Sequence, residues 1–343
     1  MNPFIVVSIV VFYISIVVNL FVRHISLSKS LFLDRIDENK PQKFHKQNTP
    51  RAGGISIFLS FLIGSLLLSN IEGIKLLLAS TPLFFSGLVE DLKRNVKPSI
   101  RLLFAFVSAA IVIILTGLRV ENISFIHLPY LVSLGFTIFA VAGVANSINI
   151  IDGFNGLASG FSIIASVVFT LTFYKLHDLV FFEIGLILIF STLGFFVLNF
   201  PKGLIFLGDS GAYFLGFMLA ELAVALAFRH PEVSPFYCLA VMIYPVWEVI
   251  FSFYRRKILK GYPATSPDKM HFHTVLFRKM NLSNYMTSSV ILTLVSLFEF
   301  ILFFYSKRET LTSILFTLIF IISYNMSYHT LVWSRLKKIL RKN

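Results

Sequence analysis

Long apolar runs recur along the whole chain, and they constrain its fold more than any other feature of the sequence. About eleven segments of roughly 17 to 25 residues carry few charges, which is the length that an α-helix needs to cross a bilayer. Only helices and closed barrels satisfy their backbone hydrogen bonds inside a membrane, and these runs lack the alternation of barrel strands. The sequence therefore predicts an all-α, polytopic membrane bundle of about 10 to 11 transmembrane helices.

The composition supports one membrane domain over the whole chain, residues 1–343. Hydrophobic residues make up 56% of the chain and charged residues 14%, whereas soluble domains are about 25% charged. The third and fifth spans are expected to be short or interrupted, and a ten-span reading that merges the second and third segments stays open. The expected spans lie near residues 2–22, 53–71, 74–89, 99–118, 129–146, 157–174, 180–200, 211–228, 235–254, 284–304 and 310–331.

The positive charges predict the orientation. The first span has no basic residue before it and Arg23 after it, so its N-terminus is expected to face outward. With that topology 24 of the 30 Lys and Arg residues fall on one side, which the positive-inside rule assigns to the cytoplasm. The net charge of +13 is then mostly a topology signal rather than a sign of nucleic-acid binding. The expected cytoplasmic loops are about 23–52, 89–101, 147–156, 201–210 and 255–283.

Three acidic or amide-rich groups stand at the cytoplasmic ends of apolar segments. They are Glu90 with Asp91, the segment from Asn146 to Asp152, and Asp209. Carboxylates at membrane depth are costly and usually functional. Since all three groups share one side of the membrane, we expect a single site there, built around a metal ion.

Each group also has a purely structural interpretation. Asn146, Asn149 and Asp152 are spaced at i, i+3 and i+6, which places their oxygens on one face if the helix extends that far. The alternative is a turn that caps the next helix. Asp209 could likewise be an N-cap, and Glu90 and Asp91 could be an interfacial pair neutralised by neighbouring lysines.

Basic residues and histidines complete the candidate site. Lys93 and Arg101 follow the first acidic pair and could bind phosphates. Lys43, His45 and Arg51 precede Gly53 and Gly54, whose backbone suits a phosphate at a helix start. In the loop 255–283, His271 and His273 lack the spacing of a structural zinc site and could equally be solvated. Glu248, inside the ninth span, should face the bundle interior or a cavity.

Taken together these motifs resemble the polyprenyl-phosphate N-acetylhexosamine-1-phosphate transferases, in the WecA-like branch and more distantly MraY. The resemblance extends from about residue 37 to residue 279. It implies transfer of a sugar-1-phosphate from a UDP-sugar to undecaprenyl phosphate, with release of UMP and with Mg²⁺ (or Mn²⁺) as cofactor. The product would start a cell-surface glycan such as O-antigen or capsule at a bacterial inner membrane, and assembly as a homodimer stays open. The motifs are 37–54, 87–92, 146–160, 206–216 and 266–273.

The resemblance also implies roles for individual residues. Asp209 and Asn149 would bind Mg²⁺, while Glu90, Asp91 and Asp152 would be catalytic or support the site. Asn155 would contact the uracil and Phe206 would stack on it, with Asn146 also on the substrate side. The remaining expected substrate contacts are Arg101 and Lys93 for the diphosphate, Lys43, His45 and Arg51 for the lipid phosphate, and His271 and His273 for the sugar or diphosphate.

Two departures from the family pattern stand out. The family usually has two aspartates where this chain has Glu90 and Asp91, and many members have aspartate where Asn155 stands. Direct attack by the lipid phosphate and a two-step route through a carboxylate both stay open, and direct attack is favoured. The rival function is a secondary transporter that uses buried acids for ion coupling, but no internal repeat is found and the acids cluster at span ends.

Overall fold

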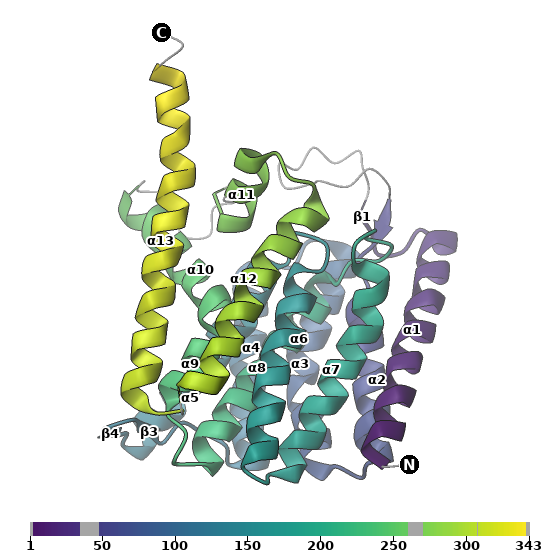
Figure 1. Cartoon of the computed structure of the whole chain (residues 1–343). Coiled ribbons are helices and arrows are strands. Elements are labelled where there is room, and N and C mark those ends of the chain that lie inside the picture. Colours follow the sequence, from purple (N-terminus) through teal and green to yellow (C-terminus); the bar gives the residue numbers. More distant parts are fainter. Residues whose placement is uncertain (1–2, 35–47, 260–269, 307, 341–343) are drawn as a thin grey trace.

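The computed structural model describes residues 3–34, 48–259, 270–306 and 308–340, with side chains placed as far as residue 332. These residues form an upright bundle of helices with a short β-hairpin at each end (Figure 1). The helices are α1 (Pro3–Lys29), α2 (Gly53–Leu67), α3 (Ile71–Lys93), α4 (Pro98–Thr116), α5 (Tyr130–Ile151), α6 (Leu157–Lys175), α7 (Leu179–Asn199), α8 (Gly208–Arg229), α9 (Pro235–Val241), α10 (Ile243–Tyr254), α11 (Phe272–Met280), α12 (Asn284–Tyr305) and α13 (Thr310–Leu340), with a π-helical turn at Arg255–Leu259. The antiparallel strand pairs are β1 (Leu33–Asp34) with β2 (Thr49–Pro50), and β3 (Asn122–Ile123) with β4 (Ile126–His127).

The prediction of a polytopic helical membrane bundle is confirmed. Within the described residues nine helices are long and apolar enough to cross a membrane, and the bent pair of α9 and α10 makes a tenth. Each predicted apolar segment coincides with a helix. The segment expected at 53–71 is the short helix α2 of 15 residues, which spans about 22 Å at 1.5 Å per residue.

The interruption falls in the ninth span rather than in the third or fifth. Helices α3 and α5 run without a break for 23 and 22 residues, so the expectation that they are short is wrong. The polar residues at their ends, such as Asp91 and Asn149, continue these helices and do not interrupt them. The ninth span turns by 80° at Met242. Pro245 lies just after this turn, and its missing N–H prevents a regular helical hydrogen bond there.

Helix α8 lies at the centre of the bundle and positions the other elements. It packs against α2, α3, α5 and α6, and it is buried along nearly its whole length. Small residues allow close approach, since a Cβ on Gly216 would lie 2.7 Å from Cα of Ala145 in α5.

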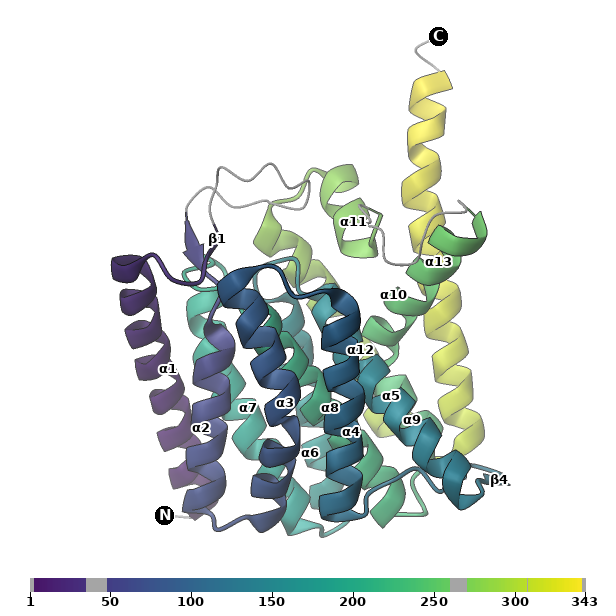
Figure 2. The ribbon, with the colours of Figure 1, turned by 180° about the vertical axis from the view of Figure 1, so that it is seen from behind.

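The polar helix ends gather at the upper end of the bundle in Figure 1. Helices α3, α5 and α7 end there and α8 begins there, in the same region as β1 and α11, as the reverse view in Figure 2 also shows. Helix α13 continues beyond the bundle at this end (Figure 1). At the opposite end, side-chain caps begin the helices: Asn70 accepts from Gly73 N in α3, and Asp178 accepts from Phe181 N in α7. The fold therefore brings the ends of α3 and α5 and the start of α8, which carry Asp91, Asn149 and Asp209, to one end of the bundle.

Candidate active site

A short parallel pairing brings Arg51 beside the start of α8. Phe206 N donates to Pro50 O at 2.8 Å, and Gly53 N donates to Phe206 O at 2.9 Å. Arg51 and Phe206 form a parallel β-bridge. Residues that lie about 155 positions apart in the sequence thus form one strand-like layer, which leads directly into α2 on one side and α8 on the other.

Asp91, at the end of α3, caps the N-terminus of α8. Its carboxylate is fully buried and accepts from Asp209 N at 2.8 Å, from Ser210 N at 2.9 Å and from the Ser210 hydroxyl at 2.7 Å. A carboxylate at a helix N-terminus satisfies free amide groups and interacts favourably with the helix dipole. Asp91 therefore fixes the backbone that carries Asp209.

Glycine makes this close approach of α3 and α8 possible. A Cβ on Gly87 would lie 2.6 Å from Ser210 N, and a Cβ on Gly208 would lie 2.6 Å from Oδ2 of Asp91. Gly208 has a φ of +76°, a conformation that strains any residue with a side chain. The backbones of the two helices are consequently in direct contact at the site.

Asp209 lies between two arginines. Its Oδ1 accepts from Arg51 Nη2 at 2.9 Å, and its Oδ2 accepts from Arg101 Nη1. Arg51 is also 3.8 Å from Oδ1 of Asp91. Because Asp209 is buried, these two guanidinium groups offset the cost of its charge. The expected acidic residue of α8 and two of the expected phosphate-binding cations thus form one cluster.

The end of α5 approaches this cluster through Tyr213. The amide Nδ2 of Asn149 donates to the Tyr213 hydroxyl at 3.2 Å, and the guanidinium of Arg101 lies 5.9 Å from the centre of the Tyr213 ring. Tyr213 stands four residues after Asp209, on the same face of α8. The sequence reading missed this residue, although its i+4 position relative to Asp209 is a signal that could have found it.

Asp152 follows the last turn of α5. Helix α5 extends through Ile151, so Asn146 and Asn149 lie on its final turns, one turn apart. Burial raises the pKa of Asp152 to about 7, while the positive charge of Arg51 acts in the opposite direction. This electrostatic coupling to Arg51 places Asp152 in the field of the arginine–aspartate cluster.

The loop after Asp152 faces a different neighbour. Asn155 N donates to Oδ1 of Asn284 at 2.7 Å, and Nδ2 of Asn155 donates to Pro201 O at 3.0 Å. Asn155, in the loop between α5 and α6, therefore packs against the turn that connects α7 to α8.

Of the two histidines, His273 lies beside the same loop. A Cβ on Gly153 would lie 3.5 Å from Nε2 of His273, and the rings of Phe154 and His273 are 5.3 Å apart in an edge-to-face contact. Burial lowers the pKa of His273 to about 3, so its imidazole is neutral at physiological pH. His271 instead contacts Glu248, with 2.8 Å between Nδ1 and Oε1.

Some predicted residues lie away from the cluster. Glu90 accepts from Val96 N at 2.8 Å and so closes the turn between α3 and α4. Lys93, in the last turn of α3, is exposed. Lys43 and His45 lie outside the described residues.

The oxygen atoms near Asp209 suit a magnesium ion that is shared with a substrate. Among the described residues, no group of three His, Cys, Asp or Glu side chains converges as a protein-only metal site would require. Mg²⁺ commonly binds through one or two protein oxygens together with substrate phosphates and water. With Nδ2 of Asn149 turned to Tyr213, its Oδ1 is the atom left for a ligand. Asp209 and Asn149 therefore fit such an ion chemically.

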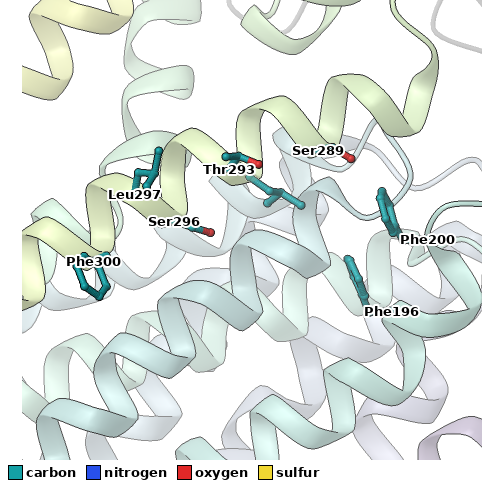
Figure 3. Close-up of a pocket in the computed structure, with 8 residues that line it drawn as sticks. Phe196, Phe200, Ser289, Thr293, Ser296, Leu297 and Phe300 are labelled. Carbon is teal, nitrogen blue, oxygen red and sulfur yellow. The ribbon is translucent and has the colours of Figure 1, made fainter.

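A separate groove of about 510 Å³ opens beside this end of the bundle. Its walls are aromatic side chains of α7 and a mixed apolar and hydroxyl face of α12 (Figure 3). Phe200, at its upper end, packs against the position of Gly156, where a Cβ would lie 2.7 Å from the ring. None of the residues that line the groove belongs to the predicted site. They are Phe196, Phe200, Ser289, Leu292, Thr293, Ser296, Leu297 and Phe300.

Comparison with known proteins identifies a clear set of relatives. A family model described as glycosyl transferase family 4 matches residues 74–227, which include Asp91, Arg101, Asn149, Asp152 and Asp209. An undecaprenyl-phosphate alpha-N-acetylglucosaminyl 1-phosphate transferase of Thermotoga maritima is 33% identical over 252 residues, covering 72% of this chain and 74% of the relative. A probable undecaprenyl-phosphate N-acetylglucosaminyl 1-phosphate transferase of Bacillus subtilis is 28% identical over 277 residues, covering 77% and 76%. A decaprenyl-phosphate N-acetylglucosaminephosphotransferase of Mycobacterium tuberculosis is 27% identical over 267 residues, covering 67% and 65%.

Proposed function

Because this chain belongs to glycosyl transferase family 4, we propose that it transfers N-acetylhexosamine 1-phosphate from a UDP-sugar to undecaprenyl phosphate, releasing UMP. The products are UMP and undecaprenyl-diphosphate-sugar. The names of the relatives support N-acetylglucosamine as the sugar and a polyprenyl phosphate as the acceptor. The reaction would take place at the inner membrane of a bacterium and would start a cell-envelope glycan.

The observation that carries this proposal is the pairing of Asp209 with Arg51 and Arg101 at the N-terminal end of the buried helix α8. The guanidinium groups of Arg51 and Arg101 both contact the Asp209 carboxylate. Guanidinium groups bind phosphate oxygens and a carboxylate binds a divalent cation, so this site suits a diphosphate with a cation beside it. A lipid phosphate can reach this end of the bundle from the bilayer, and a nucleotide sugar can reach it from the aqueous side.

Magnesium would be held by Asp209 and Asn149. When bound, it would neutralise charge on the diphosphate oxygens of the nucleotide sugar. Asp91 would keep Asp209 in place through the N-terminus of α8, and Tyr213 would keep the amide of Asn149 oriented.

The remaining residues would bind the substrates. Arg51 and Arg101 would hold diphosphate oxygens, with Lys93 at the exposed rim. Asn155 and Phe206 would contact the uracil, with Asn146 on the same side. His271 and His273 would line the sugar or diphosphate side. Lys43 and His45, outside the described residues, would bind the phosphate of the lipid.

The chemical step is a displacement at phosphorus. An oxygen of the lipid phosphate bonds to the phosphorus that carries the sugar, and the bond from that phosphorus to the bridging oxygen breaks. UMP leaves with the electron pair. The lipid phosphate is already an anion, so it needs no general base.

The hydrogen bonds of Asp91 support direct attack rather than a covalent intermediate on that residue. A nucleophilic carboxylate needs a free oxygen. In Asp91 both oxygens accept from the start of α8.

The test is an assay of the purified full-length protein with undecaprenyl phosphate and a panel of UDP-sugars, in which UMP is measured. UMP release with UDP-N-acetylglucosamine, in the presence of Mg²⁺, is expected. Lack of UMP from every donor, with Mg²⁺ or Mn²⁺ present, would contradict the transferase function. The Asp209→Asn variant serves as the inactive control, since it keeps its shape but loses the charge.

A further inference from the structure

Glu248 lies in the first half of α10, just past the break in the ninth span, and is fully buried. Hydrogen bonds from three different residues converge on its carboxylate. His271 Nδ1 lies 2.8 Å from Oε1, Phe272 N lies 3.2 Å from Oε1, and the Tyr324 hydroxyl donates to Oε2 at 2.6 Å. The carboxylate therefore joins α10, the start of α11 and α13.

This set of contacts distinguishes Glu248 from the other buried glutamates. Both oxygens of Glu221 in α8, and Oε2 of Glu299 in α12, have no hydrogen-bond partner among the described residues. A buried carboxylate is costly unless it is hydrogen-bonded, and Glu248 has its donors arranged around it. Such an arrangement points to a role that depends on the position of those donors.

The contacts assign the protonation of His271. An ionised carboxylate can only accept hydrogen bonds, and the Phe272 amide and the Tyr324 hydroxyl already donate to it. Nδ1 of His271 therefore carries its proton toward Glu248, and Nε2 is the nitrogen left for another partner.

His271 stacks against His273. The rings of His271 and His273 are parallel within 5° and have centres 5.5 Å apart. His273 in turn lies over Gly153 and Phe154, directly after Asp152. A continuous set of contacts thus leads from the broken span to the loop of the candidate active site.

We propose that Glu248 is a positioning residue that orients His271 and holds the start of α11 over the loop after Asp152, so that the histidine pair meets the diphosphate-sugar donor. The proposal rests on the proposed function for the identity of the donor. It does not depend on that function for the position of α11, which can be measured without any substrate.

The first measurement is hydrogen–deuterium exchange over residues 270–280 in the full-length protein in detergent. Glu248→Gln keeps the size of the side chain but turns an NH₂ group toward donors that need an acceptor. Hydrogen bonds to a charged carboxylate stabilise the segment more than those to a neutral amide. Their weakening should let the segment open more often, so exchange should accelerate about tenfold. Glu299→Gln, a matched change at a buried glutamate of α12, should leave this exchange unchanged.

The second measurement is steady-state kinetics with UDP-N-acetylglucosamine. Glu248→Gln should raise KM for the UDP-sugar about tenfold and change kcat less, because the histidines act on donor binding. Glu248→Asp keeps a carboxylate and should recover part of the loss. A general loss of structure would lower the fraction of active protein and kcat, with KM unchanged.

Tyr324→Phe provides a milder test if Glu248→Gln does not fold. It removes one donor and leaves the contacts to His271 and Phe272, so exchange should accelerate about threefold. Wild-type exchange and wild-type KM in Glu248→Gln, or wild-type exchange in Tyr324→Phe, would overturn the proposal. If the wild-type protein releases no UMP, the proposed function fails, whereas the exchange comparison still decides the role of Glu248.

Discussion

Ser210 donates two hydrogen bonds to one oxygen of Asp91, from its backbone N at 2.9 Å and from its hydroxyl at 2.7 Å. The carboxylate at the end of α3 thus acts as the N-terminal cap of α8. The sequence predicts Asp91 as a catalytic or supporting acid, and its contacts show that it holds the backbone of Asp209 at the start of α8.

Asp91→Asn should lower both stability and activity. The amide would present an NH₂ group to the backbone donors of Asp209 and Ser210, so we expect a loss of about 1–3 kcal/mol in the free energy of unfolding. Thermal unfolding in detergent and the UMP assay measure the two effects. For stability, Glu90→Gln is the matched control, since its amide oxygen can still accept from Val96 N. Equal losses of stability in the two variants would argue against the capping role.

Gly87→Ala should disrupt the site without touching a polar group. The added methyl would lie 2.6 Å from Ser210 N, which forces α3 and α8 apart and should cost about 1–3 kcal/mol. Gly143→Ala offers the control, because a Cβ at Gly143 in α5 meets no atom within 4 Å. UMP release should fall strongly in the first variant and stay near wild type in the second. Full activity in Gly87→Ala would show that the helix contact can relax.

A chelator should abolish UMP release, and added Mg²⁺ should restore it. In Asp209→Asn the restoration should fail, because one of the two expected oxygen ligands has lost its charge. Circular dichroism should show unchanged helix content in this variant. Activity of Asp209→Asn at wild-type Mg²⁺ concentrations would remove Asp209 from the metal site.

Tyr213→Phe isolates the hydrogen bond to Asn149. The ring remains beside Arg101, but the Asn149 amide loses its partner at 3.2 Å. The Mg²⁺ concentration needed for half-maximal activity should rise about two- to tenfold, which corresponds to a hydrogen bond of ordinary strength. An unchanged Mg²⁺ dependence would mean that Asn149 is oriented by something else.

Asp152 should make stability depend on pH. Its pKa is about 7 in the folded protein. Burial raises this pKa from 3.8, and the positive charge of Arg51 offsets part of the increase. Between these two values the folded state holds a proton that the unfolded state has lost, so the stabilisation is full below the lower value and is lost as the pH rises through about 7.

Asp152→Asn has no such proton to lose. The thermal midpoint of the wild type should therefore fall relative to that of Asp152→Asn between about pH 5 and about pH 8. Unfolding scans at the two pH values measure this difference. An equal change of thermal midpoint with pH in the two proteins would contradict the raised pKa of Asp152.

The positions of the membrane helices could be predicted because each is a long apolar run bounded by charge or turn residues. The break at Met242 could not, because the apolar run continues through it and one proline, Pro245, is compatible with a kink or a plain helix. Helix α11 was also missed, since it is short and lies in a polar loop.

Part of the candidate site could be predicted in its residues, but its contacts could not. Carboxylates at span ends identified Asp91 and Asp209 as members, yet the same residue type serves as a cap or as a ligand. The choice depends on a partner more than a hundred positions away. The link between Glu248 and His271 was likewise hidden, because nothing adjacent to either residue indicates the other.

The pairing of Pro50 with Phe206 has a consequence for how the protein is made. During synthesis the segment before α2 that contains Pro50 emerges before α3, while its hydrogen-bonding partner Phe206 emerges only after α7 has followed. Until then Arg51 has no Asp209 to bind and the carboxylate of Asp91 has no helix to cap. The candidate site is therefore assembled only late in membrane insertion, and a chain that stops before residue 206 carries Arg51 and Asp91 without the partners that position them.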